Sequence, residues 1–538
     1  MQKQAVQTLG GWNFDNTYAR LDERLASRLD PVPVADPELV LFNEPLAEML
    51  GLVFRAQAAS TRNPRKVPGD RPQNESASRP EDGPAQSAPT ASTRNPDESL
   101  DAALLLSGNK LPPGSEPIAQ AYAGHQFGHF TMLGDGRAIV LGEQIAPDGS
   151  RYDIQFKGSG RTPFSRGGDG RATLYSMLRE YLISEAMHAL GIPTSRSLAV
   201  VRTGEQVFRE VVHEGAVLTR VSSSHIRVGT FQYARLALPA ERFSELIRYT
   251  IRRHDPDLAE SETPAADLLV RVMERQAALV AQWMQVGFIH GVMNTDNMSL
   301  AGETFDYGPC AFMNAYDPDT VFSSIDEHGR YAFGNQPQVA HWNLSRFAEA
   351  LLPAIDPDEN TAIDKANDLL RRFTGMFESR RMEMMARKLG FPELAASDRP
   401  WVDGLLEQLK EIRADYTNSF LALQGDLVDE SLLLTAGSPR DAITRFSGIR
   451  EQWQDRLRDA GIPLEEAVAR MRAANPAVIP RNHLVEDALD EMVQHNRMEP
   501  FDALLAVLRN PDRCSDEPAR WQAPPPDGDG GYQTFCGT

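Results

Sequence analysis

Residues 290–309, HGVMNTDNMSLAGETFDYGP, hold the pattern from which the fold can be inferred. His290 and Asn297 lie seven positions apart in a segment with no helical or strand periodicity, and Asp306 follows just before a Tyr-Gly pair. Asparagine and aspartate side chains carry the oxygen ligands that Mg²⁺ takes beside phosphate groups. The segment therefore predicts a metal site in a loop, with Asn297 and Asp306 as its ligands.

The same segment follows the catalytic-loop pattern of protein kinases, H-R-D-x-x-x-x-N, in all but one important position. His290 and Asn297 fall in register, but Val292 occupies the place of the catalytic aspartate. Valine can neither orient a substrate hydroxyl nor accept its proton. Asp296 is the nearest acid that could act as a base, and the alternative is that Asp296 only forms a turn in NTDN.

Upstream residues supply the remaining parts of a kinase site in the expected order. FTMLGDGRAIVLGEQ, residues 130–144, alternates apolar and polar positions around a Gly-Asp-Gly turn and predicts a hairpin. RYDIQFKGSG, residues 151–160, places Lys157 at the end of a strand. The next predicted helix, which stops at Gly191, offers Glu180 as an ion-pair partner for Lys157, with Glu185 as the alternative on another face.

From about residue 240 the patterns become helical, and Thr263-Pro264 predicts the start of a long helix that ends at Gly287. A β-rich part followed by an α-rich part indicates an α+β, protein-kinase-like fold of two lobes with N- and C-terminal extensions. We predict an N-terminal extension (1–54), a disordered low-complexity insert (55–99), a nucleotide-binding N-lobe (100–238), a helical C-lobe (239–500) and a C-terminal tail (501–538).

Composition narrows the set of partners. The formal net charge is −20, from 55 Lys+Arg against 75 Asp+Glu, so most of the surface would repel nucleic acid. The sequence has no apolar run long enough to span a membrane and no signal-peptide pattern near residue 1. We therefore expect a cytoplasmic monomer that binds neither nucleic acid nor membrane.

Cysteine and histidine residues suggest no structural zinc. The three cysteines, Cys310, Cys514 and Cys536, show no C-x-x-C spacing, and we expect reduced thiols. A redox pair of Cys310 with Cys536 is the alternative. His125 and His129 could mimic a zinc pair, but turn glycines separate them and no glutamate adjoins either one, so structural hydrogen bonding is the better interpretation.

Arginines gather in glycine-rich loops and at predicted strand ends. In a chain of net charge −20 such a group predicts a polyphosphate pocket, whereas any single member could be a solvated loop charge. The group consists of Arg137, Arg161, Arg166, Arg171, Arg220 and Arg227.

Long motifs in the chain resemble the selenoprotein O family. The segments include AYAGHQFGHFTMLGDGRAIVLGE, YDIQFKGSGRTPFSRGGDGRATLYSMLREYLISEAMHALGIPTSRSL, TRVSSSHIRVGTFQ and HGVMNTDNMSLAGETFDYGPCAFM, with FDNTYARL near the start and CGT at the end. The resemblance implies a pseudokinase fold that binds ATP in a flipped orientation and transfers AMP to Ser, Thr or Tyr hydroxyls of proteins. Mg²⁺ or Mn²⁺ would assist, and related bacterial proteins are also described as transferring UMP with Mn²⁺.

The resemblance also implies roles for individual residues. Asp296 matches the proton acceptor, Asn297 and Asp306 match the metal ligands, and Glu180 matches the acid that pairs with Lys157. Some family members carry selenocysteine near the C-terminus, where this chain has Cys536. The implied nucleotide-binding residues are Gly134, Gly136, Arg137, Lys157, Asp169, Gly170, Arg220, Arg227 and Asp306.

Two other functions stay open at this point. The first is an atypical kinase that uses Asp296 as its base and transfers the γ-phosphate. The second is a non-catalytic scaffold that binds ATP without turnover. The metal pair Asn297 and Asp306 argues against the scaffold, because metal ligands are of little use without chemistry.

Overall fold

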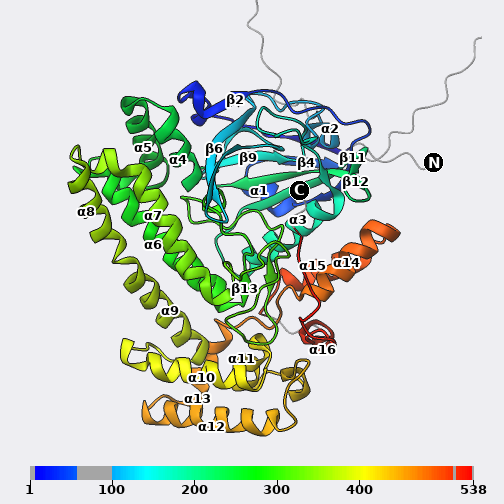
Figure 1. The fold of residues 1–538 in the computed structure, drawn as a ribbon. Helices are drawn as coiled ribbons and strands as arrows, with labels where there is room; N and C mark the ends of the chain where they lie inside the picture. Colours follow the sequence, from blue (N-terminus) through cyan, green and yellow to red (C-terminus); the bar gives the residue numbers. More distant parts are fainter. Residues whose placement is uncertain (1–6, 57–99, 513–516, 536–538) are drawn as a thin grey trace, which may run out of the picture.

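The computed structural model describes residues 7–56, 100–512 and 517–535, and places a β-rich lobe beside a larger helical region (Figure 1). The insert predicted at 55–99 lies, from residue 57 on, outside the described residues. The described strands are β1 (Gln7–Gly10), β2 (Ala26–Arg28), β3 (Glu38–Phe42), β4 (Val53–Ala56), β5 (Leu100–Asp101), β6 (Ile118–Gln126), β7 (His129–Gly134), β8 (Ala138–Ile145), β9 (Arg151–Lys157), β10 (Ala172–Thr173), β11 (Arg196–Phe208), β12 (Val212–Ser222), β13 (Phe288–Ile289) and β14 (Ala311–Phe312).

One large sheet forms the centre of the β-rich lobe. Its strands follow the order β2-β6-β8-β9-β12-β11-β3, and β7 and β10 pair with β6 and β12. Along β9, Ile154 and Phe156 point into an apolar core on one face of the sheet, so the alternate residues up to Lys157 point to the other face. That second face looks toward the helical region and carries the polar side chains described below.

The hairpin predicted around Gly134-Asp135-Gly136 is wrong in one respect. β7 and β8 do not pair with each other; both pair with β6, one after the other. Asp135 explains the difference, because its backbone N–H and its carboxylate both bond to the backbone of Gln120 in β6. The hairpin turn lies instead at Phe127-Gly128, where both residues have positive φ as a two-residue type I′ turn requires.

The helical region begins after the sheet. Pro264 opens α6 and Gly287, at φ +73°, follows its end, as the sequence predicted. The described α-helices are α1 (Glu44–Met49), α2 (Ala102–Leu106), α3 (Leu174–Ala189), α4 (Val228–Ala237), α5 (Ala240–His254), α6 (Pro264–Gln285), α7 (Gln336–Ile355), α8 (Glu359–Leu370), α9 (Phe373–Leu389), α10 (Arg399–Glu411), α11 (Tyr416–Gln424), α12 (Ala442–Asp459), α13 (Leu464–Arg472), α14 (Asn482–His495), α15 (Glu499–Leu508) and α16 (Pro518–Gln522).

Helix α3 connects the two parts of the molecule. It starts with a capping bond from the Ser176 N–H to the Thr173 hydroxyl and packs against β11 and β12. The C-terminal helices α14 and α15 pack against its other side (Figure 1). Arg179 of α3 also pairs with Glu486 of α14 at 2.8 Å, so the chain's last helices hold α3 in place.

The first residues of the chain complete the β-rich lobe. β2 and β3 form the two ends of the large sheet, although most of its strands come from residues 118–222. At the other end of the chain, α15 crosses residue 500. The divisions predicted at residues 54, 99, 238 and 500 remain predictions. Across the described residues, none of the helices is both long and apolar enough to cross a membrane.

Candidate nucleotide and metal site

Lys157 forms the centre of a buried group of charges on the inner face of the sheet. Its Nζ lies 2.7 Å from Glu180 Oε2 and 2.6 Å from Asp306 Oδ1. Arg220 donates from Nε to the other oxygen of Glu180 at 2.8 Å. The alternative partner Glu185 is instead bonded to Arg196 at 2.7 Å, so of the two candidates α3 presents Glu180 to the lysine.

The charges of this group are mutually dependent. Burial alone would raise the pKa of Glu180, but the charges of Arg220 and Lys157 hold that pKa below its ordinary value. Burial likewise opposes ionisation of Asp306, and the same two cations hold its pKa far below the usual range. Both carboxylates are therefore ionised at neutral pH. Their negative charges in turn compensate the buried positive charges of Lys157 and Arg220.

Asp306 adopts a backbone conformation that few residues other than glycine tolerate. Its φ is +68°, and aspartate is among the side chains that accept this region most readily. The residue stands directly after Phe305, which is buried. Such an uncommon conformation, next to a buried lysine, is typical of a functional position rather than a packing position.

Asp296 lies in a short 3₁₀ turn, Thr295–Asn297, beside β6. Its side chain is buried, and Oδ1 has no hydrogen-bond partner among the described residues. Burial raises the pKa of Asp296 to about 6. Gly124 of β6 makes room for the carboxylate, because a Cβ at that position would collide with Asp296 Oδ1. A buried carboxylate with a raised pKa and one oxygen without a partner has the properties expected of a general base.

Val292 and Asn297 show how the catalytic loop differs from that of a kinase. Val292 is buried, and its carbonyl accepts a bond from Asn297 Nδ2 at 3.0 Å. The amide oxygen of Asn297 is thereby turned away from this contact. The described residues hold no cluster of three or more His, Cys, Asp or Glu that could bind a metal alone. The carboxylate of Asp306 and the amide oxygen of Asn297 are donor types that a divalent cation takes together with phosphate and water oxygens.

Arg227 joins the catalytic loop to the chain segment after β12. Its guanidinium donates to the backbone carbonyls of His225 and Asp296, at 3.2 Å each. It lies 4.2 Å from the ring centre of Tyr122 and 4.9 Å from that of Phe305. Contacts with two aromatic rings restrict the guanidinium, which is the arrangement expected of an arginine held ready for an anion.

The predicted glycine turn lies against the loop that follows β9. Thr162 Oγ1 donates to the carbonyl of Asp135 at 2.6 Å, and a Cβ on Gly134 would collide with the ring of Phe164. Arg137 precedes β8, and its charge contributes to lowering the pKa of Asp306, which places it near that carboxylate. The structure therefore brings this turn to the same side of the sheet as Lys157.

Two other predicted residues, Asp169 and Gly170, lie farther along the same loop. Asp169 is exposed and pairs with Arg209 at 2.8 Å, on the outside of the loop rather than with the charges around Lys157. Gly170 has φ +69° and packs against the backbone of Gly160, where a Cβ would not fit. Arg171 pairs with Glu205 at 2.9 Å, on the Arg209 side of the loop.

The histidines and cysteines of the sequence prediction are placed as follows. His125 Nδ1 lies 2.8 Å from Gln232 Nε2, a structural hydrogen bond. Cys310 is buried and has no disulfide partner among the described residues, and burial raises the pKa of its thiol to about 12. Cys514 and Cys536 fall outside the described residues, so the redox pair stays untested. Thr534 nevertheless lies beside Pro309, to whose carbonyl its hydroxyl donates at 2.7 Å.

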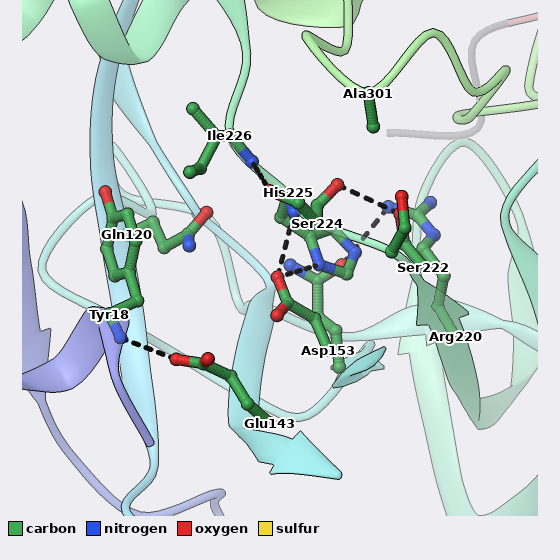
Figure 2. A network of polar contacts seen from close by, with 12 residues as sticks. Tyr18, Gln120, Glu143, Asp153, Arg220, Ser222, Ser224, His225, Ile226 and Ala301 are labelled. Atoms are coloured by element: carbon green, nitrogen blue, oxygen red, sulfur yellow. Dashed lines mark hydrogen bonds and ion pairs between the residues drawn. The ribbon is translucent and has the colours of Figure 1, made fainter. Parts of the chain in front are cut away.

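The sequence interpretation missed several residues of the site. Gln155 bonds to Arg220. Asp153, two residues earlier on β9, bonds to His225 (Figure 2). Alternation along β9 could have identified both, because Asp153, Gln155 and Lys157 share one face of the strand. No local signal identifies Tyr122 or Phe305, because their role depends on where Arg227 folds.

Fold and site together define a kinase-like protein with a buried lysine–glutamate pair and a second carboxylate, Asp306, beside the lysine, in which the catalytic aspartate of kinases is replaced. The chain belongs to the SelO family of nucleotidyltransferases: the family profile described as "Protein adenylyltransferase SelO" matches residues 95–509.

Curated relatives match the chain along almost its whole length. "Protein nucleotidyltransferase YdiU" of Shouchella clausii is 50% identical over 98% of this chain and 99% of the relative. The proteins of the same name from Brevibacillus brevis and Syntrophotalea carbinolica are 49% and 48% identical, each over 98% of both chains. Among solved structures, a rhoptry antigen kinase domain of Toxoplasma gondii matches 52% of this chain and 89% of its own, at 11% identity and a TM-score of 0.24.

Proposed function

We propose that this protein transfers AMP from ATP to hydroxyl side chains of other proteins. The observation that carries the proposal is that Val292 stands where a kinase has its catalytic aspartate, while Lys157, Glu180 and Asp306 still form one group of charges. Asp296, whose backbone carbonyl accepts from Arg227, is the acid that the catalytic loop offers in its place. The description of the matching family as adenylyltransferases supports transfer of AMP over transfer of the γ-phosphate.

The side chains present support each part of such a transfer. The hydroxyl oxygen of the acceptor attacks the α-phosphorus, and Asp296 accepts the hydroxyl proton. The bond from the α-phosphorus to the bridging oxygen breaks, and pyrophosphate leaves. Lys157, Arg220 and Arg227 compensate the charge that develops on the pyrophosphate. With a pKa of about 6, Asp296 is mostly ionised at neutral pH and can take up the proton.

Asn297 and Asp306 would hold the divalent cation that the family resemblance implies. A bound Mg²⁺ or Mn²⁺ neutralises phosphate charge and orients the reacting phosphate. The negative charge of Asp306 is secured by Lys157, since their 2.6 Å ion pair keeps the carboxylate ionised. Val292 fits this proposal, because the base need not stand in the kinase position.

Paired radiolabelling tests the proposal. The protein is incubated with Mg²⁺ and an acceptor protein, with ATP labelled at the α-phosphate in one sample and at the γ-phosphate in the other. We expect label on the acceptor only from the α position. Label from the γ position alone would indicate a kinase, and no label from either would favour the scaffold. Replacing ATP with UTP and Mg²⁺ with Mn²⁺ measures whether UMP is also transferred.

A further inference from the structure

Three side chains of β9 project from the inner face of the sheet, one after another along the strand. Asp153, Gln155 and Lys157 alternate along the strand, so neighbours are about two residues of strand rise apart. Arg220 of β12 lies directly opposite Gln155 in the strand register. The site therefore extends inward from Lys157 and does not end at the lysine.

In the side-chain amide of Gln155, the oxygen has a hydrogen-bond partner and the nitrogen has none among the described residues. Arg220 NH1 donates to Gln155 Oε1 at 3.2 Å. A guanidinium can only donate hydrogen bonds, so it is the amide oxygen that must face Arg220. The amide nitrogen, Nε2, is buried and has no partner in the part of the chain that the structure describes. Buried donors are nearly always paired, and an acceptor from a ligand would satisfy this nitrogen.

Arg227 supplies a second donor of the same kind. Its Nε and NH1 are bonded to backbone carbonyls, but NH2 is buried with no hydrogen-bond partner within the described ranges. The nearest carboxylate oxygen, on Asp135, is 3.9 Å away. Arg220 and Arg227 both lie over the ring of Phe305, at 5.9 and 4.9 Å from its centre. Two guanidiniums beside one ring make an anion the fitting acceptor.

The segment that carries Arg227 is itself held firmly. Asp153 accepts from the backbone N–H of His225 at 2.8 Å and lies 3.1 Å from its ring Nδ1 (Figure 2). Asp153 also pairs with Arg253 of α5 at 2.6 Å. Because His225 cannot turn, the carbonyl that receives Arg227 Nε keeps its direction, and the free NH2 of Arg227 is fixed in orientation.

We propose that Gln155 binds the terminal phosphate of the nucleoside triphosphate through its free Nε2, beside Arg220 and Arg227. The residue would then contribute to selecting a triphosphate over shorter phosphate chains. This inference rests on the proposed function, since it takes a nucleoside triphosphate as the ligand.

Binding of two nucleotides to the full-length protein tests the proposal. The probes are ATP with a methylene group in place of the oxygen between its α- and β-phosphates, which cannot be transferred, and AMP. In Gln155→Leu, of similar size, we expect the Kd for the triphosphate analogue to rise about tenfold and the Kd for AMP to change less than twofold. Gln155→Glu keeps an acceptor for Arg220 but adds a negative charge, so its loss of triphosphate affinity should be larger.

Thr219→Val provides the matched control. Thr219 is buried next to Arg220, but it lies across the strand register from Phe156 and points to the opposite face of the sheet. We expect wild-type Kd values for both probes in this variant. Equal weakening of both probes in Gln155→Leu, or no weakening of the triphosphate in either Gln155 variant, would overturn the proposal.

Failure of the proposed function gives a different result, because the binding measurement requires no transfer. If the wild type transfers no α-label while Gln155→Leu still loses triphosphate affinity selectively, the proposal of AMP transfer is refuted and the proposed phosphate site is supported. If α-label is transferred normally but both Gln155 variants bind the triphosphate as the wild type does, the assignment of Gln155 alone falls.

Discussion

Glu180 is the residue whose replacement tests the buried charge group most directly. It is 3% exposed and pairs with two cations, Lys157 at 2.7 Å and Arg220 at 2.8 Å. Glu180→Gln keeps the size of the side chain but removes its charge. Removing one partner from a buried ion pair costs about 3–5 kcal/mol, because the remaining charge stays buried without compensation.

Two effects should follow from Glu180→Gln. The melting temperature should fall by several degrees, since two cations lose their shared anion. Transfer of α-label should fall about 100- to 1,000-fold, the loss typical of a displaced group that stabilises transition-state charge. Both are measurable on the same preparation, by thermal denaturation and by the labelling assay described above.

Glu185→Gln is the matched control for this prediction. Glu185 lies on the same helix, is also 3% exposed, and pairs with Arg196 rather than with Lys157. We expect a similar loss of melting temperature and nearly unchanged transfer. If Glu185→Gln reduced transfer as strongly as Glu180→Gln does, the effect would come from the packing of α3, and our account of the charge group would be refuted.

Three further changes test other parts of the site and fold. Asp306→Ala should abolish labelling by removing a metal ligand, and retention of wild-type labelling would contradict that assignment. Gly124→Ala should lower kcat about 100-fold, because its Cβ displaces the base Asp296, while triphosphate-analogue binding measured by calorimetry stays within a few-fold. Burial lowers the pKa of Lys388 to about 7, so between that value and about 10.5 the folded chain binds fewer protons than the unfolded chain. The free energy of unfolding should therefore rise with pH across this window, by at most about 1.4 kcal/mol per pH unit. Melting curves at several pH values should show a smaller rise in Lys388→Met than in the wild type. An equal rise in both proteins would contradict the lowered pKa of Lys388.

Local patterns predicted the elements that carry their own start and stop signals. The helix from Thr263-Pro264 to Gly287 and the helix that ends before Gly191 both appear where expected, because a proline in the first turn and a glycine after the last turn act within a few residues. Thr263 itself makes no side-chain capping bond. The pairing of Lys157 with Glu180 was also predictable, since the strand end and the following helix are neighbours in the chain. Glycine turns were less informative, because Gly134 could belong to a hairpin or to a continuing strand edge.

The parts that sequence could not predict depend on contacts between distant segments. Whether Gly134-Asp135-Gly136 closes a hairpin is decided by Gln120, to whose backbone Asp135 is bonded. The position of α3 depends on α14 and α15, which lie about 300 residues later in the chain. Neither contact can be predicted from the local pattern, because both partners have the pattern of an ordinary strand or helix.

The geometry of Asp296 bears on two interpretations that the sequence alone does not separate, a general base and a turn residue. As a turn residue alone, its carboxylate would keep an ordinary pKa. In the structure a bond to its own backbone lowers the pKa, but burial outweighs that bond and raises the pKa to about 6. In the structure Oδ1 is buried without a hydrogen-bond partner among the described residues, and space for it exists only because residue 124 is glycine. A carboxylate kept in this state costs stability, and the proposed role of Asp296 as acceptor of a substrate proton accounts for that cost.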